Sequence, residues 1–221
     1  MNLSSDTLSV LKNFSDINQN LLIKPGSKVQ TISTMKNILA EAEIPEKFNS
    51  EFAIYDLSEF LRSVELFDSP VLNFNGGSNV TIAEEKTKQN IKYFFADKSV
   101  VVAPTKSINM PDKTISFTLT KDNFGKLMKA TTTLGLPDIA VRGDGSKIKM
   151  VATDKKNNSS NEYAIEVGET DKKFSAYFKT ENFKMVGDDY DVAISVQKIS
   201  HFVNRNKAIQ YWIALEPDSE F

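Results

Sequence analysis

The chain has 221 residues, enough for one large domain or two small ones, and its hydrophobic fraction of 40% and charged fraction of 25% are ordinary for a globular protein. It contains no cysteine, which excludes disulfides, thiolate metal sites and cysteine nucleophiles. No apolar run approaches the roughly 20 residues of a membrane-spanning helix, and the first residues lack the basic and apolar regions of a signal peptide. We therefore expect a cytosolic protein.

The formal net charge of −2 conceals an uneven distribution of charges along the chain. Eight acidic and two basic residues lie between Glu41 and Asp68, whereas eight basic and four acidic residues lie between Thr114 and Lys156. A near-neutral total can therefore combine a basic face with an acidic one. Random variation of surface charge explains the same pattern equally well, so charge alone does not decide between them.

The first predicted helix spans residues 6–18, where apolar residues recur every three positions and Ser4 or Ser5 can cap the start. Alternating apolar residues and the Pro-Gly pair then predict strands with a turn between them. The elements expected in this region are a strand at 21–23, a hairpin turn at 24–28, a return strand at 29–33 and a third strand around 37–44.

A strand at 52–55 runs into a second short helix, which Asp56 or Ser58 can cap. The sequence Asn-Gly-Gly-Ser at 75–78 is a good hairpin turn between two apolar runs. The elements expected here are a helix at 56–64 and strands at 71–74, 80–82 and 92–95. Two prolines and a run of polar residues then predict an interdomain linker at 101–113.

After the linker, the beginning of the chain is repeated. One pattern occurs at 3–11 and again at 119–127: a leucine, a hydroxyl residue, any residue, an aspartate and a final leucine. The two copies are offset by 116 residues. The elements expected in this second half are strands at 115–119, 139–141, 147–152, 163–167, 174–178, 190–196, 202–203 and 209–215, with helices at 121–130 and 179–186. A repeat of this length indicates a duplicated domain rather than a solenoid.

We therefore predict an α+β chain of two similar domains, 1–100 and 114–221, joined by the linker at 101–113. Each domain is expected to have antiparallel sheets with two short helices gathered on one face.

Catalysis has little support in the sequence. His201 is the single histidine, and it is interpreted as an ordinary surface or strand histidine. The glycines at 142–147 lack the phosphate-loop spacing, and a hairpin turn explains them. The acidic residues Asp188, Asp189 and Asp191 are better read as a solvated turn than as a metal site. We expect no catalytic residue, no metal and no enzyme activity, and a carboxylate-pair hydrolase is the weakest of the alternatives.

The helix expected at 121–130 has a basic surface. Phe124, Leu127 and Met128 mark its buried face, so its three lysines point away from that face. Such residues can contact phosphates without reading bases. The basic residues assigned to this role are Lys12, Arg62, Lys121, Lys126, Lys129 and Lys184, on the two predicted helices of each half. A plain solvated helix face remains the alternative explanation.

The sequence resembles the sliding clamps, or DNA polymerase processivity factors, of T-even-type bacteriophages. The likeness is carried by the segments 7–14, 23–26, 52–61, 101–106 and 214–219 and covers essentially the whole chain in order. It is specific in the first half and the linker, and weak between about 131 and 210.

This resemblance implies a homotrimeric ring of the DNA clamp fold, with sheets outside and helices lining a hole that holds duplex DNA. It implies as partners DNA, the phage DNA polymerase, a clamp loader ATPase and, in late transcription, transcription factors with RNA polymerase. It implies no cofactor and a location in the cytoplasm of the infected host.

Partners of this family insert C-terminal peptides with apolar and aromatic side chains into a hydrophobic pocket. Candidates for that pocket in this chain lie near Val101, Pro104 and Trp212, although a core role is favoured for Trp212. The last residues, 216–221, are expected to be flexible.

Another class of protein fits the duplication as well: a phage tail or baseplate ring component, which would need no basic inner face.

Overall fold

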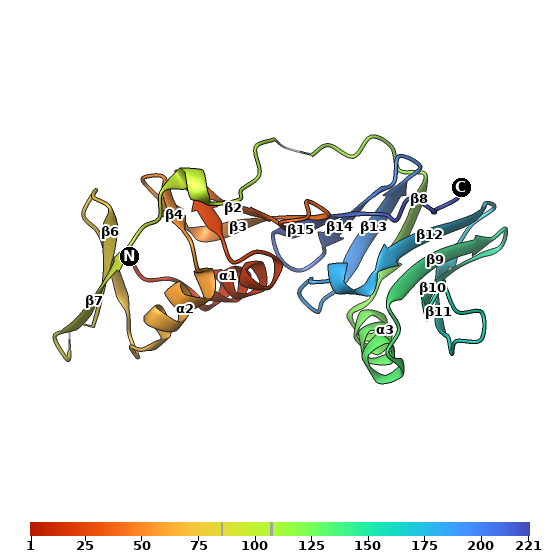
Figure 1. Ribbon diagram of the computed structural model, residues 1–221, viewed down its shortest axis with the longest axis horizontal. Coiled ribbons are helices and arrows are strands. Elements are labelled where there is room, and N and C mark those ends of the chain that lie inside the picture. The colour runs from red at the N-terminus through yellow and green to blue at the C-terminus, as the bar shows by residue number, and fades with distance from the viewer. Residues whose placement is uncertain (85, 107) are drawn as a thin grey trace. The chain divides into compact units, whose positions relative to one another are not determined.

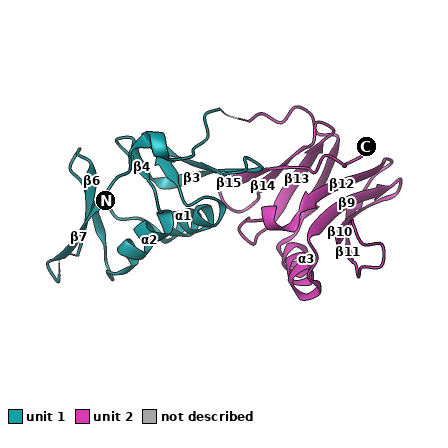
Figure 2. Cartoon of the chain, in the orientation of Figure 1, with its two compact units in different colours: residues 1–106 teal, residues 107–221 magenta. Residues whose placement is uncertain are grey.

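The computed structural model describes residues 1–84, 86–106 and 108–221. The chain forms two compact units, residues 1–106 and 107–221 (Figure 2). The boundary falls inside the segment 101–113, in which Ser107 lies outside the described residues.

Unit 1 is an α+β unit of antiparallel strands and two α-helices, with the labels of Figure 1. Its elements are α1 (Ser5–Ile17), β1 (Leu21–Ile23), β2 (Gly26–Ile32), β3 (Ile38–Phe48), β4 (Phe52–Ile54), α2 (Leu57–Glu65), β5 (Val71–Phe74), β6 (Asn79–Glu84), β7 (Gln89–Phe94) and the 3-10 helix η1 (Lys98–Val100).

Both helices of unit 1 begin at the caps that the sequence predicts. The Ser4 side chain accepts a hydrogen bond from the backbone N–H of Thr7, and the Asp56 side chain accepts one from Glu59. These bonds satisfy backbone donors that the first turn of a helix leaves without partners. The apolar stripes of both helices are buried, with Phe14 of α1 fully enclosed.

The hairpin predicted at 24–28 is wrong. β1 pairs with β4, whereas β2 pairs with β3, so this segment joins two strands that have different partners. Pro25 has no N–H to donate across a ladder, and Gly26 takes a φ of 120°, which bends the chain away from β1. The hairpin forms instead between β2 and β3, where Ser33 donates its N–H to the Ile38 carbonyl.

Unit 2 contains two antiparallel sheets and one α-helix among its described residues. The strands pair in the orders β11-β10-β9-β12 and β15-β14-β13-β8. Its elements are β8 (Ile115–Leu119), α3 (Lys121–Leu134), β9 (Asp138–Asp144), β10 (Lys147–Thr153), β11 (Tyr163–Glu169), β12 (Lys173–Lys179), the 3-10 helix η2 (Thr180–Asn182), β13 (Tyr190–Ser195), β14 (Ile199–Asn204) and β15 (Ile209–Ala214).

The second short helix predicted for this unit, at 179–186, is wrong, since the segment forms only the 3-10 turn η2. The Thr180 hydroxyl donates to the Leu136 carbonyl rather than capping a helix. Phe183 and Met185 are both buried around exposed Lys184, which is the two-residue alternation of an extended chain. So short a segment also gains too few hydrogen bonds to offset helix nucleation.

Aromatic side chains hold the core of each unit together. In unit 2, Tyr190 packs edge to face against Phe202 and Tyr211, with ring centroids 6.3 and 6.1 Å apart. Phe124 of α3 reaches the same tyrosine at 6.2 Å, so the helix is anchored to the strands by a ring contact. In unit 1 the corresponding cluster is built around Phe52, which stacks on Phe95 at 4.6 Å.

The two units repeat one another, as the sequence predicts. The caps of α1 and α3, Ser4 and Thr120, are separated by the offset of the sequence repeat. The ladders β2–β3 and β5-β6-β7 of unit 1 match β10–β11 and β13-β14-β15 of unit 2. In unit 2, β8 pairs with β13. At the equivalent place in unit 1, Met1 exchanges backbone hydrogen bonds with Leu72 on β5.

The last residues, predicted to be flexible, are bound to β12. We call residues 216–221 the tail. Ser175 and Glu220 exchange both of their backbone hydrogen bonds at 2.9 Å, and the Glu216 N–H donates to the Tyr177 carbonyl at 2.8 Å. The prediction failed because composition showed a short polar end, whereas the free edge of β12 offers it unpaired backbone groups.

Candidate nucleic-acid interface

α3 is capped at both ends and buries one stripe. Thr120 accepts a hydrogen bond from the N–H of Asn123, and Gly135 ends the helix in the left-handed conformation with a φ of 64°. Phe124, Leu127 and Thr131 are buried. Met128, predicted to lie on this face, is only half-buried, at the border of the stripe.

The opposite surface of α3 carries the three predicted lysines. Lys121, Lys126 and Lys129 are exposed, and all three line one open hollow. Gly125 also lines this hollow and has no side chain to project into it. Three ammonium groups within a little over two turns of helix can contact successive phosphates of a nucleic-acid backbone.

Two carboxylates moderate this positive surface. Asp122 pairs with Lys126 at 2.7 Å, one turn along the helix, and its hydrogen bond raises the pKa of the Lys126 ammonium above the ordinary value. Asp189 accepts a hydrogen bond of 2.6 Å from the backbone N–H of Lys121. Sequence reasoning missed this second contact because 68 residues separate its partners.

The three helices differ in charge. α1 carries Lys12 beside Asp6 and Asp16, and α2 carries Arg62 between two glutamates, so each has more acidic than basic residues. α3 carries three lysines and one aspartate. Lys12 and Arg62 are exposed, but each sits in a mixed field that weakens attraction for phosphate.

Lys184, predicted to lie on a helix, is exposed on the extended segment that follows η2. It therefore lacks the regular spacing that relates the three lysines of α3.

The acidic residues at 188–191 are engaged in structural contacts. Asp188 accepts a 2.6 Å hydrogen bond from the Asn206 amide, and Asp191 lies 3.6 Å from Arg205. Among residues 1–84, 86–106 and 108–221, no group of three or more aspartate, glutamate or histidine side chains is arranged to hold a metal ion.

The glycine-rich segment 142–147 forms the turn between β9 and β10, as predicted. Asp144 accepts hydrogen bonds from the backbone N–H groups of Ser146 and Lys147, at 2.9 and 2.8 Å. These donors are used inside the turn rather than presented to a phosphate.

His201 and Trp212 form a stacked pair on neighbouring strands, with ring centroids 4.5 Å apart and planes within 7°. The histidine Nε2 also lies 2.8 Å from the Gln210 side-chain oxygen. The tryptophan is 7% exposed. Both residues thus have the strand and core roles that the sequence favoured.

The other two candidates for a partner pocket lie at the end of unit 1. Val101 is half-buried and Pro104 is buried. Two asparagine side chains fix the chain between them. Asn20 accepts a hydrogen bond from the Val102 N–H at 3.2 Å, and Asn18 donates one to the Val102 carbonyl at 3.0 Å.

In the part of the chain that the structure describes, no helix is long and apolar enough to cross a membrane.

Solved structures match this chain along nearly all of its length. Proliferating cell nuclear antigen (PCNA) from Entamoeba histolytica aligns over 95% of this chain and 94% of its own, with a TM-score of 0.69 and 14% identity. PCNA from A. fulgidus, solved with the C-terminal region of FEN-1, aligns over 96% of each chain with a TM-score of 0.71 and 11% identity. The fold is therefore that of the clamp class.

Sequence comparison identifies the family. Residues 4–103 match the family model "DNA polymerase processivity factor", and residues 116–217 match "gp45 sliding clamp, C terminal". The sliding clamp of Vibrio phage KVP40 is 36% identical over 223 residues, covering 98% of this chain and 99% of that one. Those of Escherichia phage RB69 and Enterobacteria phage T4 are 27% and 28% identical, each covering 99% of this chain and 98% of its own.

The chain belongs to the sliding clamp family of T4-type bacteriophages, whose members are DNA polymerase processivity factors.

Proposed function

We propose that this protein acts without catalysis as a homotrimeric ring that encircles duplex DNA, slides along it and tethers the phage replicative polymerase. The observation that carries the proposal is the charge of α3, where three exposed lysines share one hollow in a protein of net charge −2. Contacts limited to phosphates hold DNA without fixing a sequence, which permits sliding. Lys12, Arg62 and Lys184 are proposed as weaker contributors.

The free strand edges support ring formation. Met1 covers the edge of β5, and the tail covers the edge of β12. β7 and β11 end their sheets on the other sides. Open edges invite pairing with another chain, and two different edges on one subunit give a head-to-tail contact that can close into a ring. We propose that β7 of each subunit pairs with β11 of the next.

The charges of the two edges are complementary. β7 and the turn before it carry Lys92 and Lys88, whereas β11 carries Glu166 and Glu169, which also pair with Lys147 on β10 at 4.0 and 2.9 Å. Opposite charges across paired strands stabilise the pairing and fix its register. We take domain limits of 1–100 and 114–221, with 101–113 as linker, as the units of this ring, and the resemblance supplies its number of three subunits.

Exposed apolar side chains support a partner-binding role for the segment that ends unit 1. Tyr55, Val100 and Val102 are exposed by 62, 55 and 37%, and Asn20 binds the backbone of both Tyr55 and Val102. Exposed apolar groups that lie together are typical of protein interfaces. The A. fulgidus clamp was solved with a C-terminal region of its partner. We propose that polymerase docks here by a peptide, near Val101 and Pro104.

The clamp loader ATPase, the late-transcription factors with RNA polymerase and the host cytoplasm as location are further proposals, which rest on the family resemblance.

The triple variant Lys121→Glu/Lys126→Glu/Lys129→Glu tests the proposal. We expect retention on nicked circular DNA and polymerase processivity to fall at least tenfold, because repulsion replaces phosphate attraction in the hollow. The matched control is Lys156→Glu/Lys173→Glu/Lys207→Glu, which makes the same change in net charge at exposed positions of the same unit. Equal processivity of the two triple variants would remove α3 from the DNA-facing role.

A further inference from the structure

The contact between the tail and β12 is a short antiparallel strand addition, centred on the bridge between Ser175 and Glu220. Besides the exchanged bonds of Ser175 and Glu220, the Tyr177 N–H donates to the Ser219 hydroxyl at 2.9 Å. Phe221 at the end stacks against Phe174, with ring centroids 6.4 Å apart. Backbone bonds of this kind bind an extended peptide, and the flanking side chains select its sequence.

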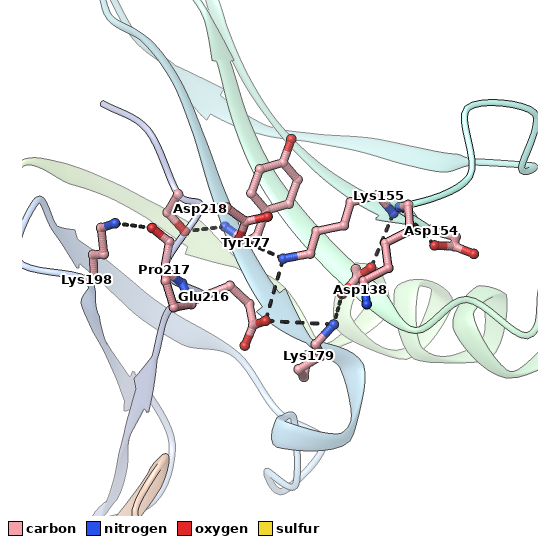
Figure 3. Close-up of polar contacts among 11 residues, drawn as sticks. Asp138, Asp154, Lys155, Tyr177, Lys179, Lys198, Glu216, Pro217 and Asp218 are labelled. Carbon is pink, nitrogen blue, oxygen red and sulfur yellow. Dashed lines mark hydrogen bonds and ion pairs between the residues drawn. The ribbon is translucent and has the colours of Figure 1, made fainter.

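Cations surround the acidic part of the tail. The Lys155 ammonium lies 2.7 Å from Asp218 and 3.5 Å from Glu216, and Lys179 lies 3.8 Å from Glu216 (Figure 3). Lys198 donates to the carbonyl of Pro217.

Lys155 depends on the tail for charge compensation. Its side chain is only 11% exposed, and both carboxylates paired with its ammonium, among the described residues, belong to the tail. Lys179, by contrast, also pairs with buried Asp138 at 2.6 Å. A nearly buried ammonium without a counter-ion is costly. If the tail leaves, Lys155 therefore requires either water or another acidic ligand.

The equivalent contact of unit 1 cannot open so easily. There, the chain leaving β7 returns to β4, and the Ala96 N–H donates to the Ala53 carbonyl at 2.9 Å. That segment continues into the connector, which holds it on both sides. Detachment of the tail thus breaks only its own few contacts, several of them exposed.

We infer that the β12 edge is a strand-addition site for an extended acidic peptide with an aromatic end, and that the tail occupies this site as a displaceable ligand of its own chain. The partner fits the chemistry of Lys155, Lys179 and Phe174, with carboxylates two residues apart and an aromatic ring beyond them. The inference goes beyond the proposed function and depends on neither DNA nor the ring.

Occupation by the tail sets a threshold for such a partner. A ligand attached by a short linker has an effective concentration in the millimolar range. A free peptide can bind only those molecules whose β12 edge is open, so its apparent dissociation constant is the intrinsic value divided by the open fraction. A variant that weakens only the tail should therefore bind the peptide more tightly.

The probe is a fluorescein-labelled peptide with the sequence of residues 215–221, measured by anisotropy. We expect Glu216→Gln/Asp218→Asn to bind it at least tenfold more tightly than the wild type, and the additional change Lys155→Gln to reverse that gain. Lys156→Gln in the same background is the matched control, because this neighbour is exposed. Equal affinity of wild type and double variant, or a gain that survives Lys155→Gln, would overturn the inference.

A second measurement needs no variant. In the wild type, a saturating concentration of the peptide should accelerate hydrogen exchange of the Glu220 amide, which loses its bond to Ser175, while the Ser175 amide stays protected by the bound peptide. A peptide with glutamine and asparagine in place of its acids should have no effect. If the Glu220 amide exchanges at the same rate with and without the acidic peptide, the tail is a permanent part of the sheet and the inference fails.

Discussion

Two glycines show how differently the same residue type is used at two sites of unit 2. At Gly143 on β9, an added Cβ would lie 2.3 Å from a ring carbon of Phe174 and 2.8 Å from the Lys172 carbonyl oxygen. At Gly125 on α3, nothing lies within 4 Å of the same position. The first glycine is required by close packing, whereas the second leaves the hollow between the lysines open.

These environments predict opposite effects of alanine. Gly143→Ala should lower the free energy of unfolding by about 1–3 kcal/mol, because the Phe174 ring and the backbone must move. Gly125→Ala should raise it by about 0.5–1 kcal/mol, because glycine is a poor residue in a helix interior. Urea unfolding of both variants measures the two values. A loss of stability in Gly125→Ala, or none in Gly143→Ala, would contradict this account of the packing.

The displaced ring has a second consequence. Phe174 stacks on Phe221, so Gly143→Ala should also loosen the tail, which faster exchange of the Glu220 amide would reveal. In Gly125→Ala that amide should exchange as in the wild type.

On the scale of single elements, α3 carries both a basic surface and a carboxylate that reduces the charge of that surface. Asp122 suits the N-terminal end of the helix dipole, and it also neutralises Lys126 in an ion pair whose side chains are 71 and 58% exposed. An exposed pair of this kind contributes little to stability. Under the proposed function, its larger effect falls on the charge that α3 would present to DNA.

Asp122→Asn should therefore strengthen retention on DNA. Loss of the carboxylate releases Lys126 for phosphate contact, so we expect the half-life on nicked circular DNA to rise severalfold. The slope of the logarithm of DNA affinity against the logarithm of salt concentration should steepen by about one, which corresponds to one more counter-ion released. The cost in stability should stay within about 1 kcal/mol. Asp171→Asn is the control, because it removes the same charge from an exposed residue that lies just before β12 and outside the α-helices. Unchanged retention in Asp122→Asn would mean that Lys126 does not contact DNA.

The elements that could be predicted from sequence are those fixed by local signals. The caps Ser4 and Asp56, the apolar stripes and the turn at 75–78 all depend on neighbouring residues. The failures concern choices among distant partners. Nothing near Pro25 indicates that β1 pairs with β4, and nothing near the tail indicates the free edge of β12. The lysines of α3 followed from helical spacing, whereas the hollow needed Asp189 from a distant turn.

At the scale of the whole chain, duplication leaves edges that must be covered. Met1 stands in unit 1 where a full strand, β8, stands in unit 2, and the tail covers β12. An uncovered edge is a liability for aggregation. Met1 and the tail cover two edges, whereas β7 and β11 are among the strands that end their sheets, so they are available for the proposed pairing.

A charge swap tests that pairing. Lys92→Glu and Glu166→Lys should each place like charges across all three proposed interfaces and raise the dissociation constant of the trimer at least tenfold, because like charges opposite one another destabilise paired strands. The double variant restores opposite charges with reversed signs and should recover most of the loss, whereas Lys156→Glu should change nothing. Sedimentation velocity separates the 24.7 kDa subunit from its trimer. Additive losses in the double variant would show that these side chains do not meet, and would place ring closure at other edges.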